Sequence, residues 1–124
     1  MDKERFKSWL DSYGRAWENR DDKAFAGLFS DNASYYANPF SEPLNGRSAI
    51  LDYWSNVICT QEQIQFNYEV LAVTQESGIA HWWASFAHVP SKTKVKLDGI
   101  FIISLNSGNC CDNFRQWWHW LEYS

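Results

Sequence analysis

Apolar residues in the first half of the chain recur at steps of three and four, the spacing of one face of an α-helix. The pattern predicts an amphipathic helix over residues 3–19, a short helix after the capping pair Asp21–Asp22, and a third helix that begins near Arg47. The apolar positions of the three helices are Phe6, Trp9, Leu10, Tyr13, Ala16 and Trp17, then Ala24, Phe25, Leu28 and Phe29, then Ile50, Leu51, Trp54, Val57 and Ile58.

After the third helix the apolar positions alternate with a period of two, which predicts β-strands. A short strand at residues 33–37 precedes four long runs at residues 64–70, 79–89, 95–105 and 111–123. Turns that contain Gly, Pro or Asn separate the long runs. Sequential strands joined by tight turns pair antiparallel, so the pattern predicts an α+β domain with an antiparallel sheet.

The last three strands are apolar on both of their faces. Neighbouring residues of a strand point to opposite faces, and here Trp82 and Trp83 are adjacent, as are Trp117 and Trp118. A sheet with one solvated face would instead alternate between apolar and polar residues. The helices can cover only one face, so we expect a second subunit to cover the other, which makes a homodimer.

Composition and charge narrow the class of protein. The chain has 124 residues, enough for a single domain over residues 1–124, and a net charge of −4. It has no basic cluster for nucleic acid, no apolar run of membrane-spanning length and no secretory signal at its start, so we expect a cytoplasmic protein. The cysteines, Cys59, Cys110 and Cys111, fit neither a disulfide framework nor a metal site.

Aromatic residues are unusually frequent, with eight Trp, six Tyr and eight Phe making up 18% of the chain. Such side chains combine a large apolar area with, in Tyr and Trp, a polar tip. They suit a core, a pocket lining or a dimer face, and composition does not choose among these uses.

Several segments match one known order of motifs. They are Tyr13-Gly14-Arg15-Ala16-Trp17, Asp21-Asp22, Leu28-Phe29, Phe40-Ser41-Glu42-Pro43 with Gly46 and Ile50, and the ending from Cys110 to His119. Together they resemble the nuclear transport factor 2-like superfamily, which includes ketosteroid isomerase and the SnoaL-like polyketide cyclases. The resemblance implies a cone-shaped, curved antiparallel sheet wrapped around three N-terminal helices and one deep pocket. Since this fold carries many chemistries, it implies no particular reaction.

Ketosteroid isomerase offers a specific comparison, because its chemistry needs a carboxylate base and acidic hydrogen-bond donors. In that family the base immediately precedes a proline after the first strand, and the matching residue here is Asn38 before Pro39. A carboxamide cannot accept and return a proton at neutral pH. Tyr13 matches the tyrosine donor, and Asp98 only approximates the acidic donor. Steroid isomerisation is therefore rejected.

With ketosteroid isomerase as the guide, the resemblance implies a set of pocket residues and a smaller set of catalytic candidates. The pocket residues are Tyr13, Trp17, Tyr36, Asn38, Trp54, Asp98, Ile100, Arg115 and Trp117, and the catalytic candidates are Asp98, His81 and His119. His81 and His88 are seven positions apart on one strand, so at most one of them faces the cavity. A structural ion pair between Asp98 and Arg115 is the alternative to catalysis. No phosphate loop, nucleophile elbow or metal motif is present, so we expect neither a cofactor nor a metal.

Two functional hypotheses follow, with a partner-binding accessory domain as a third. The first is an aromatic pocket that binds a small apolar ligand. The second is a cofactor-independent isomerase, hydratase or cyclase that acts on a cyclic or polyketide-like substrate. A pocket without a carboxylate supports the first hypothesis, and a carboxylate within hydrogen-bond reach of His81 or His119 supports the second.

Overall fold

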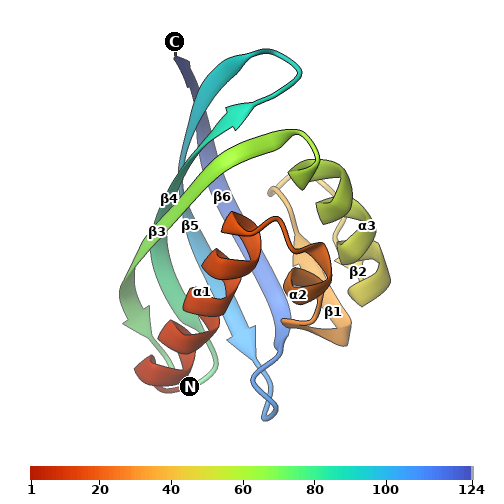
Figure 1. Cartoon of the computed structure of the whole chain (residues 1–124). Coiled ribbons are helices and arrows are strands. Elements are labelled where there is room, and N and C mark those ends of the chain that lie inside the picture. The colour runs from red at the N-terminus through yellow and green to blue at the C-terminus, as the bar shows by residue number, and fades with distance from the viewer. Residues whose placement is uncertain (124) are drawn as a thin grey trace.

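Three helices lie on one side of a curved six-stranded sheet (Figure 1). The computed structural model describes residues 1–123. Helix α1 covers Lys3–Glu18, α2 covers Asp22–Ala26 and α3 covers Arg47–Ile58, which confirms that three helices form in the predicted places. Leu28 and Phe29, predicted on the second helix, lie beyond its end, and Phe29 begins the first strand. Asp2 and Asp21 cap the first two helices, because each carboxylate accepts a hydrogen bond from the N–H group three residues later, at 2.8 and 3.0 Å. No helix in this part of the chain is long and apolar enough to cross a membrane.

The strands form one sheet in the order β2-β1-β6-β5-β4-β3. Their bounds are Phe29–Tyr36 (β1), Leu44–Asn45 (β2), Gln61–Val73 (β3), Gly78–His88 (β4), Thr93–Leu105 (β5) and Cys111–Tyr123 (β6). All neighbours are antiparallel except β1 and β6, which run parallel. The predicted α+β fold is confirmed, and the parallel pair corrects the expectation of a wholly antiparallel sheet. No tight turn joins β1 to β6, so their relative direction is not constrained to be antiparallel.

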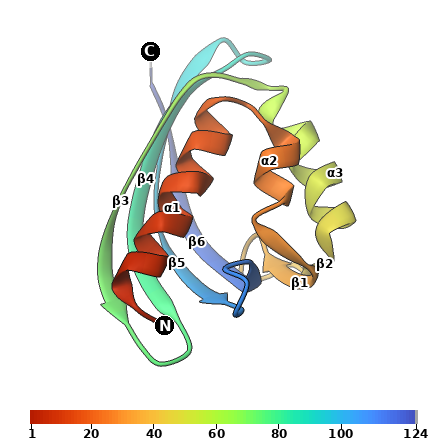
Figure 2. The same ribbon diagram turned by 60° about the horizontal axis from the view of Figure 1, so that its bottom comes forward.

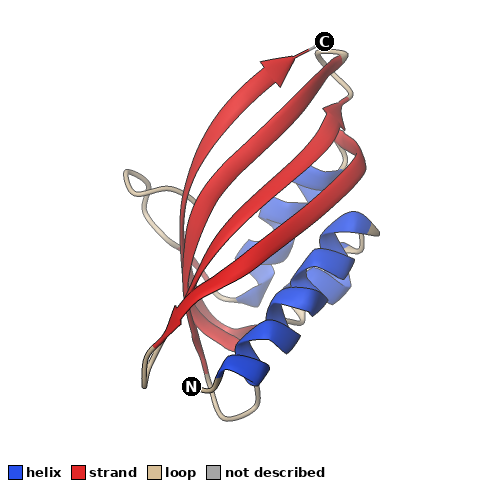
Figure 3. Cartoon of the chain, turned by 90° about the vertical axis from the view of Figure 1, so that its left-hand side faces the viewer, coloured by secondary structure: helices blue, strands red, loops and turns tan. Residues whose placement is uncertain are grey.

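The sheet bends around α1 and extends past the helices at one end. Figures 1 and 2 show α1 running along the concave side of the long strands, while α2 and α3 lie beside β1 and β2. Figure 3 shows the strands continuing beyond the helices toward the end that holds the C-terminus.

The face of the sheet toward the helices, called the inner face below, carries the core. Its buried side chains are Ile64 and Phe66 from β3, Ala80, Trp82, Ala84 and Phe86 from β4, Val95, Phe101 and Ile103 from β5, and Phe114 and Gln116 from β6. The opposite side is the outer face, where Trp83, Trp117 and Leu121 are exposed in the single chain. Apolar residues therefore occupy both faces, as predicted, and the helices cover one of them.

Candidate functional site

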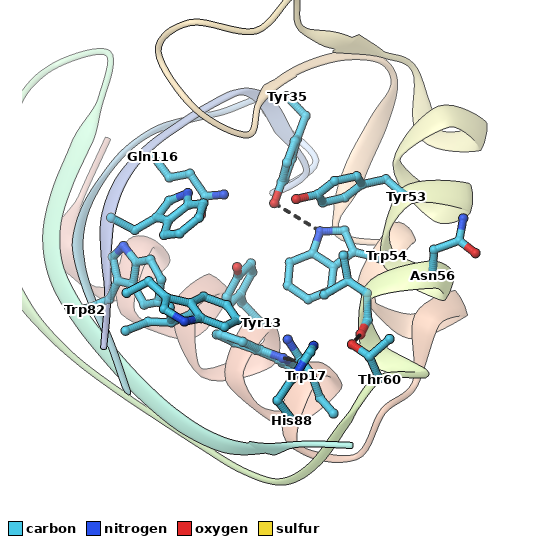
Figure 4. Close-up of a pocket in the computed structure, with 15 residues that line it drawn as sticks. Tyr13, Trp17, Tyr35, Tyr53, Trp54, Asn56, Thr60, Trp82, His88 and Gln116 are labelled. Atoms are coloured by element: carbon cyan, nitrogen blue, oxygen red, sulfur yellow. Dashed lines mark hydrogen bonds between the residues drawn. The ribbon is translucent and has the colours of Figure 1, made fainter. Parts of the chain in front are cut away.

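A cavity of about 420 Å³ lies between the inner face of the sheet and the helices (Figure 4). Its lining residues are Tyr13, Trp17, Tyr35, Tyr53, Trp54, Asn56, Val57, Thr60, Gln61, Trp82, His88, Leu97, Gln116, Trp118 and Trp120. Five are Trp and three are Tyr, so the wall is mainly aromatic. In the described part of the chain, this lining contains no Asp, Glu, Lys or Arg.

The helices supply one wall of the cavity through Tyr13, Trp17 and Trp54, all buried. The indole N–H groups of the two tryptophans are held by hydrogen bonds to residues of the strands. The indole N–H of Trp17 donates to Oε1 of Gln61 at 2.8 Å, and the indole N–H of Trp54 donates to the hydroxyl oxygen of Tyr35 at 3.1 Å. These bonds lock the ring orientations, so the helical wall is preorganised.

Three phenol groups give the cavity its main polar character. Burial raises the pKa of Tyr13 and of Tyr35 well above the usual value, and burial also raises the pKa of Tyr53. All three phenols therefore stay protonated at ordinary pH. The Tyr35 oxygen accepts from Trp54, which leaves its proton free to donate, and the described residues offer no hydrogen bond to the other two hydroxyls. The cavity thus presents donors to any oxygen acceptor inside it.

The sheet supplies the opposite wall, with Trp82, Gln116 and Trp118. The side-chain N–H groups of Gln116 and Trp118 both donate to the carbonyl oxygen of Ala37, at 2.9 and 3.0 Å. This shared acceptor ties the segment after β1 to the cavity wall. The indole nitrogen of Trp82 is buried, finds no acceptor among residues 1–123 and lies against Gly99 of β5, so the ring of Trp82 lines the cavity while its N–H group is not presented to it.

Only part of the predicted pocket is found in the cavity lining. Tyr13, Trp17 and Trp54 are among its lining residues. Six further predicted pocket residues do not, and their placement is a correction: Tyr36, Asn38, Asp98, Ile100, Arg115 and Trp117. The strand residues among them alternate with the buried inner-face residues and therefore belong to the outer face.

The error has a physical cause in strand register. On β6 a register irregularity opposite Ser104 and Leu105 puts Cys111 and Phe114 on the same buried side, although they are three residues apart. Such an irregularity flips every later side chain to the other face. On β5 the sequence did hold a usable signal, because Lys94 and Lys96 alternate with inner residues and mark the outer face.

Asn38 belongs to the loop after β1 rather than to the cavity. Its Oδ1 accepts from the N–H groups of Phe40 and Ser41 at 2.9 and 3.1 Å, and its Nδ2 donates to Oγ of Ser41 at 2.8 Å. Asn commonly stabilises a turn in this way. The side chain is therefore used locally, at the position where ketosteroid isomerase would carry its base.

The three catalytic candidates lie together on the outer face. Nε2 of His81 lies 3.0 Å from Oδ2 of Asp98, its Nδ1 lies 3.1 Å from Oε1 of Glu69, and Asp98 pairs in register with His119. The hydrogen bond to Asp98, with a smaller contribution from Glu69, raises the pKa of His81. A carboxylate thus lies within hydrogen-bond reach of His81, the observation named as support for the enzyme hypothesis, but the pair is outside the aromatic cavity.

The structural alternative for Asp98 is also corrected. Asp98 bonds His81 rather than Arg115, whose guanidinium lies 5.3 Å from the ring centre of Tyr36. Both side chains are on the outer face, on different strands, with different partners. A catalytic role for the outer cluster remains a prediction that needs a substrate on that face.

Sequence reasoning missed most of the sheet side of the cavity. The missed sheet residues include Tyr35, Trp82, His88, Gln116, Trp118 and Trp120, and Tyr53 of α3 was missed as well. For β4 the alternation of Ala80, Trp82 and Ala84 with His81 and Trp83 gives no polarity difference that would choose a face. His88 shares its face with Trp82, so it is the histidine of β4 that reaches the cavity.

Comparison with known proteins agrees with this architecture. The model of the SnoaL-like domain matches residues 10–113. No curated protein matches the sequence. The family match covers most of the chain, including all residues from the middle of α1 to the start of β6.

Solved structures share the fold at low sequence identity. The epoxide hydrolase/cyclase-like enzyme SalBIII, described for pyran ring formation in the polyether salinomycin, has a TM-score of 0.85 at 19% identity and 98% coverage of each chain. The Δ5-3-ketosteroid isomerase from Mycobacterium sp. has a TM-score of 0.81 at 12% identity, covering 96% of this chain and 98% of that one. A computationally designed 17-OHP binder has a TM-score of 0.81 at 15% identity, covering 94% and 95%. These likenesses show the nuclear transport factor 2-like fold.

Proposed function

Because the chain belongs to the SnoaL-like domain family, we propose that its aromatic cavity binds a small, largely apolar molecule. The observation that carries the proposal is a lining of five Trp and three Tyr without a charged side chain among the described residues. The volume of about 420 Å³ falls in the range of small-molecule pockets. One relative in fold is a designed binder of 17-OHP, and this likeness supports a ligand-binding role.

The polar groups of the cavity indicate what the ligand carries. Tyr13, Tyr35 and Tyr53 are neutral donors. Buried donors without acceptors cost free energy, so a ligand that supplies an acceptor gains affinity. The lining therefore favours a ring system with a carbonyl or ether oxygen over a pure hydrocarbon.

The indole N–H signals of the tryptophans can show whether a ligand binds in the cavity or on the outer face. In a ¹H–¹⁵N NMR spectrum, 9-fluorenone and fluorene provide matched probes with and without a carbonyl oxygen. We expect both to shift the indole signals of Trp17, Trp54 and Trp82, while those of Trp83 and Trp117 stay in place. No shift of the cavity indoles at the solubility limit of either probe would overturn the proposal.

The tyrosine hydroxyls supply the matched variants. Tyr53→Phe removes a hydroxyl that has no protein partner among residues 1–123, so it should weaken fluorenone binding by about 3- to 10-fold and leave fluorene unchanged. Tyr36→Phe changes the same chemical group on the outer face and should alter neither. Equal effects of the two variants would contradict recognition of the carbonyl by Tyr53.

The second candidate is a cofactor-independent isomerase, hydratase or cyclase acting on a cyclic or polyketide-like substrate. What favours it is the presence of an imidazole, His88, in the lining of the cavity. Imidazole is the commonest side chain for general acid–base catalysis. For either function we also propose that a second copy of the chain covers the outer face.

A further inference from the structure

We infer that His88 makes the cavity a site of proton transfer, where its imidazole acts as the base toward an acidic C–H bond of the bound ligand. The inference rests on the proposed function, since the ligand must occupy the cavity. It adds an activity to binding and assigns that activity to a residue other than the candidates Asp98, His81 and His119.

Position singles out His88 among the three histidines. His81 and His119 lie on the outer face, whereas His88 lines the cavity. Figure 4 shows it on the same side of the cavity as Trp17 and Thr60. The described lining contains no carboxylate, amine or thiol, so the imidazole of His88 is its candidate general base.

A hydrogen bond at Nδ1 fixes the orientation of the His88 ring. Its Nδ1 lies 2.7 Å from Oγ of Ser91, and that oxygen lies 2.7 Å from Oγ1 of Thr93. When Nδ1–H donates to Ser91 and Ser91 donates to Thr93, the lone pair of Nε2 is free. Ser91 then stabilises the imidazolium that forms after proton uptake. Ser91 is therefore a positioning residue.

The surroundings of His88 suit a base rather than an ion pair. Gln61 of β3 and Thr93 of β5 flank it in register, and the ring of Trp120 crosses it edge-on at 6.0 Å between centres. None of these neighbours carries a charge. The one carboxylate of β6 on the inner face is Glu122, which is in register with Val95 two strands from His88 and is not among the cavity-lining residues. Asp98 belongs to the opposite face of the sheet.

A general C–H acid tests this without knowledge of the natural ligand. In 5-nitrobenzisoxazole, Nε2 of His88 would take the proton from C3. The C–H electrons then complete the C≡N bond, the N–O bond breaks and 2-cyano-4-nitrophenolate forms. The imidazolium returns its proton to water. No oxidant, metal or cofactor enters the step, and the phenolate is followed by its absorbance.

The expected result is a rate above that of imidazole at equal concentration, by about 10²-fold, the low end of general-base effects. His88→Gln should remove most of this rate enhancement. His81→Gln changes the same side chain on the outer face and should stay within about twofold of the parent. Ser91→Ala should shift the pH midpoint of the rate, and Ser91→Thr should restore it.

Two further measurements keep the outcome decisive. The pH midpoint of the parent's rate should match the titration of the His88 imidazole followed by NMR, a comparison that needs no variant. Binding of 5-nitrobenzotriazole, which lacks the acidic C–H, should shift the cavity indole signals. If that analogue binds but His88→Gln keeps the full rate, or the parent shows none, the inference is overturned while the proposed function stands. If neither binding nor rate appears, both are overturned.

Discussion

Single residues decide how closely the cavity wall can pack. Gly99 of β5 lies where an added Cβ atom would come 2.0 Å from the carbonyl oxygen of Trp117 and 2.8 Å from Nε1 of Trp82. The backbone oxygen cannot move without disturbing the sheet. Gly99→Ala should therefore destabilise the fold by about 1–3 kcal/mol or more, measured by thermal unfolding.

Gly108→Ala is the control for that substitution. Its added Cβ would meet only the side-chain oxygen of Asn106, at 3.4 Å. This variant should unfold close to the parent. A melting temperature for Gly99→Ala equal to that of Gly108→Ala would show that β5 and β6 are not as close as described.

The hydrogen bonds of His81 predict a pH-dependent contribution to stability. Asp98 and Glu69 raise its pKa in the folded state, so the protonated form favours folding. The contribution is fully present below the unfolded-state value of about 6.5 and is lost as the pH rises through the higher folded value. His81→Gln should thus cost more stability at about pH 5.5 than at about pH 9.

Urea unfolding at both pH values measures this difference. His119→Gln provides the comparison, because His119 forms no hydrogen bond with the described residues, and its cost should not change in the same way with pH. A cost of His81→Gln that is equal at both values would contradict the pairing with Asp98.

At the scale of secondary-structure elements, Trp54 joins α3 to both α2 and β1. Trp54 packs on Phe25 of α2 with ring centres 3.9 Å apart and donates to the hydroxyl of Tyr35 on β1. Removing it leaves a large void and an altered polar contact. Trp54→Ala should cost about 3–5 kcal/mol in the free energy of unfolding.

Asp52→Ala is the control that shows whether any substitution to Ala in α3 destabilises the fold as much as Trp54→Ala does. Asp52 is an exposed residue of the same helix, so its replacement should change stability by less than about 0.5 kcal/mol. Denaturant titration of both variants gives the comparison. A near-zero effect of Trp54→Ala would mean that α3 does not close the cavity.

At the scale of the whole molecule, the outer face of the sheet exposes large apolar side chains that a partner could bury. Trp83, Trp117 and Leu121 are 38%, 39% and 60% exposed there in the single chain. Monomeric proteins seldom expose large apolar patches. We expect a homodimer through this face, burying more than about 2,000 Å² in total.

Sedimentation velocity at micromolar concentration tests this expectation. Trp117→Glu places a charge at the centre of the proposed interface and should shift the protein toward monomer. Phe40→Glu, at a fully exposed loop position, controls for the added charge. A parent that sediments as a monomer would overturn the homodimer.

The helical half of the cavity followed from the sequence alone. The stripe from Phe6 to Trp17 has one apolar face, and a period of 3.6 residues lets only that face meet the sheet. Tyr13, Trp17 and Trp54 lie on such apolar helical faces and line the cavity. The family order of helices and strands added the curved sheet. Local periodicity is enough here, because a helix with one apolar stripe has one way to bury it.

The strand half was decided by tertiary structure. Trp82 and Trp83, like Trp117 and Trp118, give apolar residues to both faces, so no polarity difference selects the inner one. Because side chains of a strand alternate between the two faces, a shift of one residue moves every later side chain to the opposite face. The register irregularity between Cys111 and Phe114 causes such a shift on β6. Which histidine reaches the cavity is therefore a property of the paired sheet, which no local pattern records.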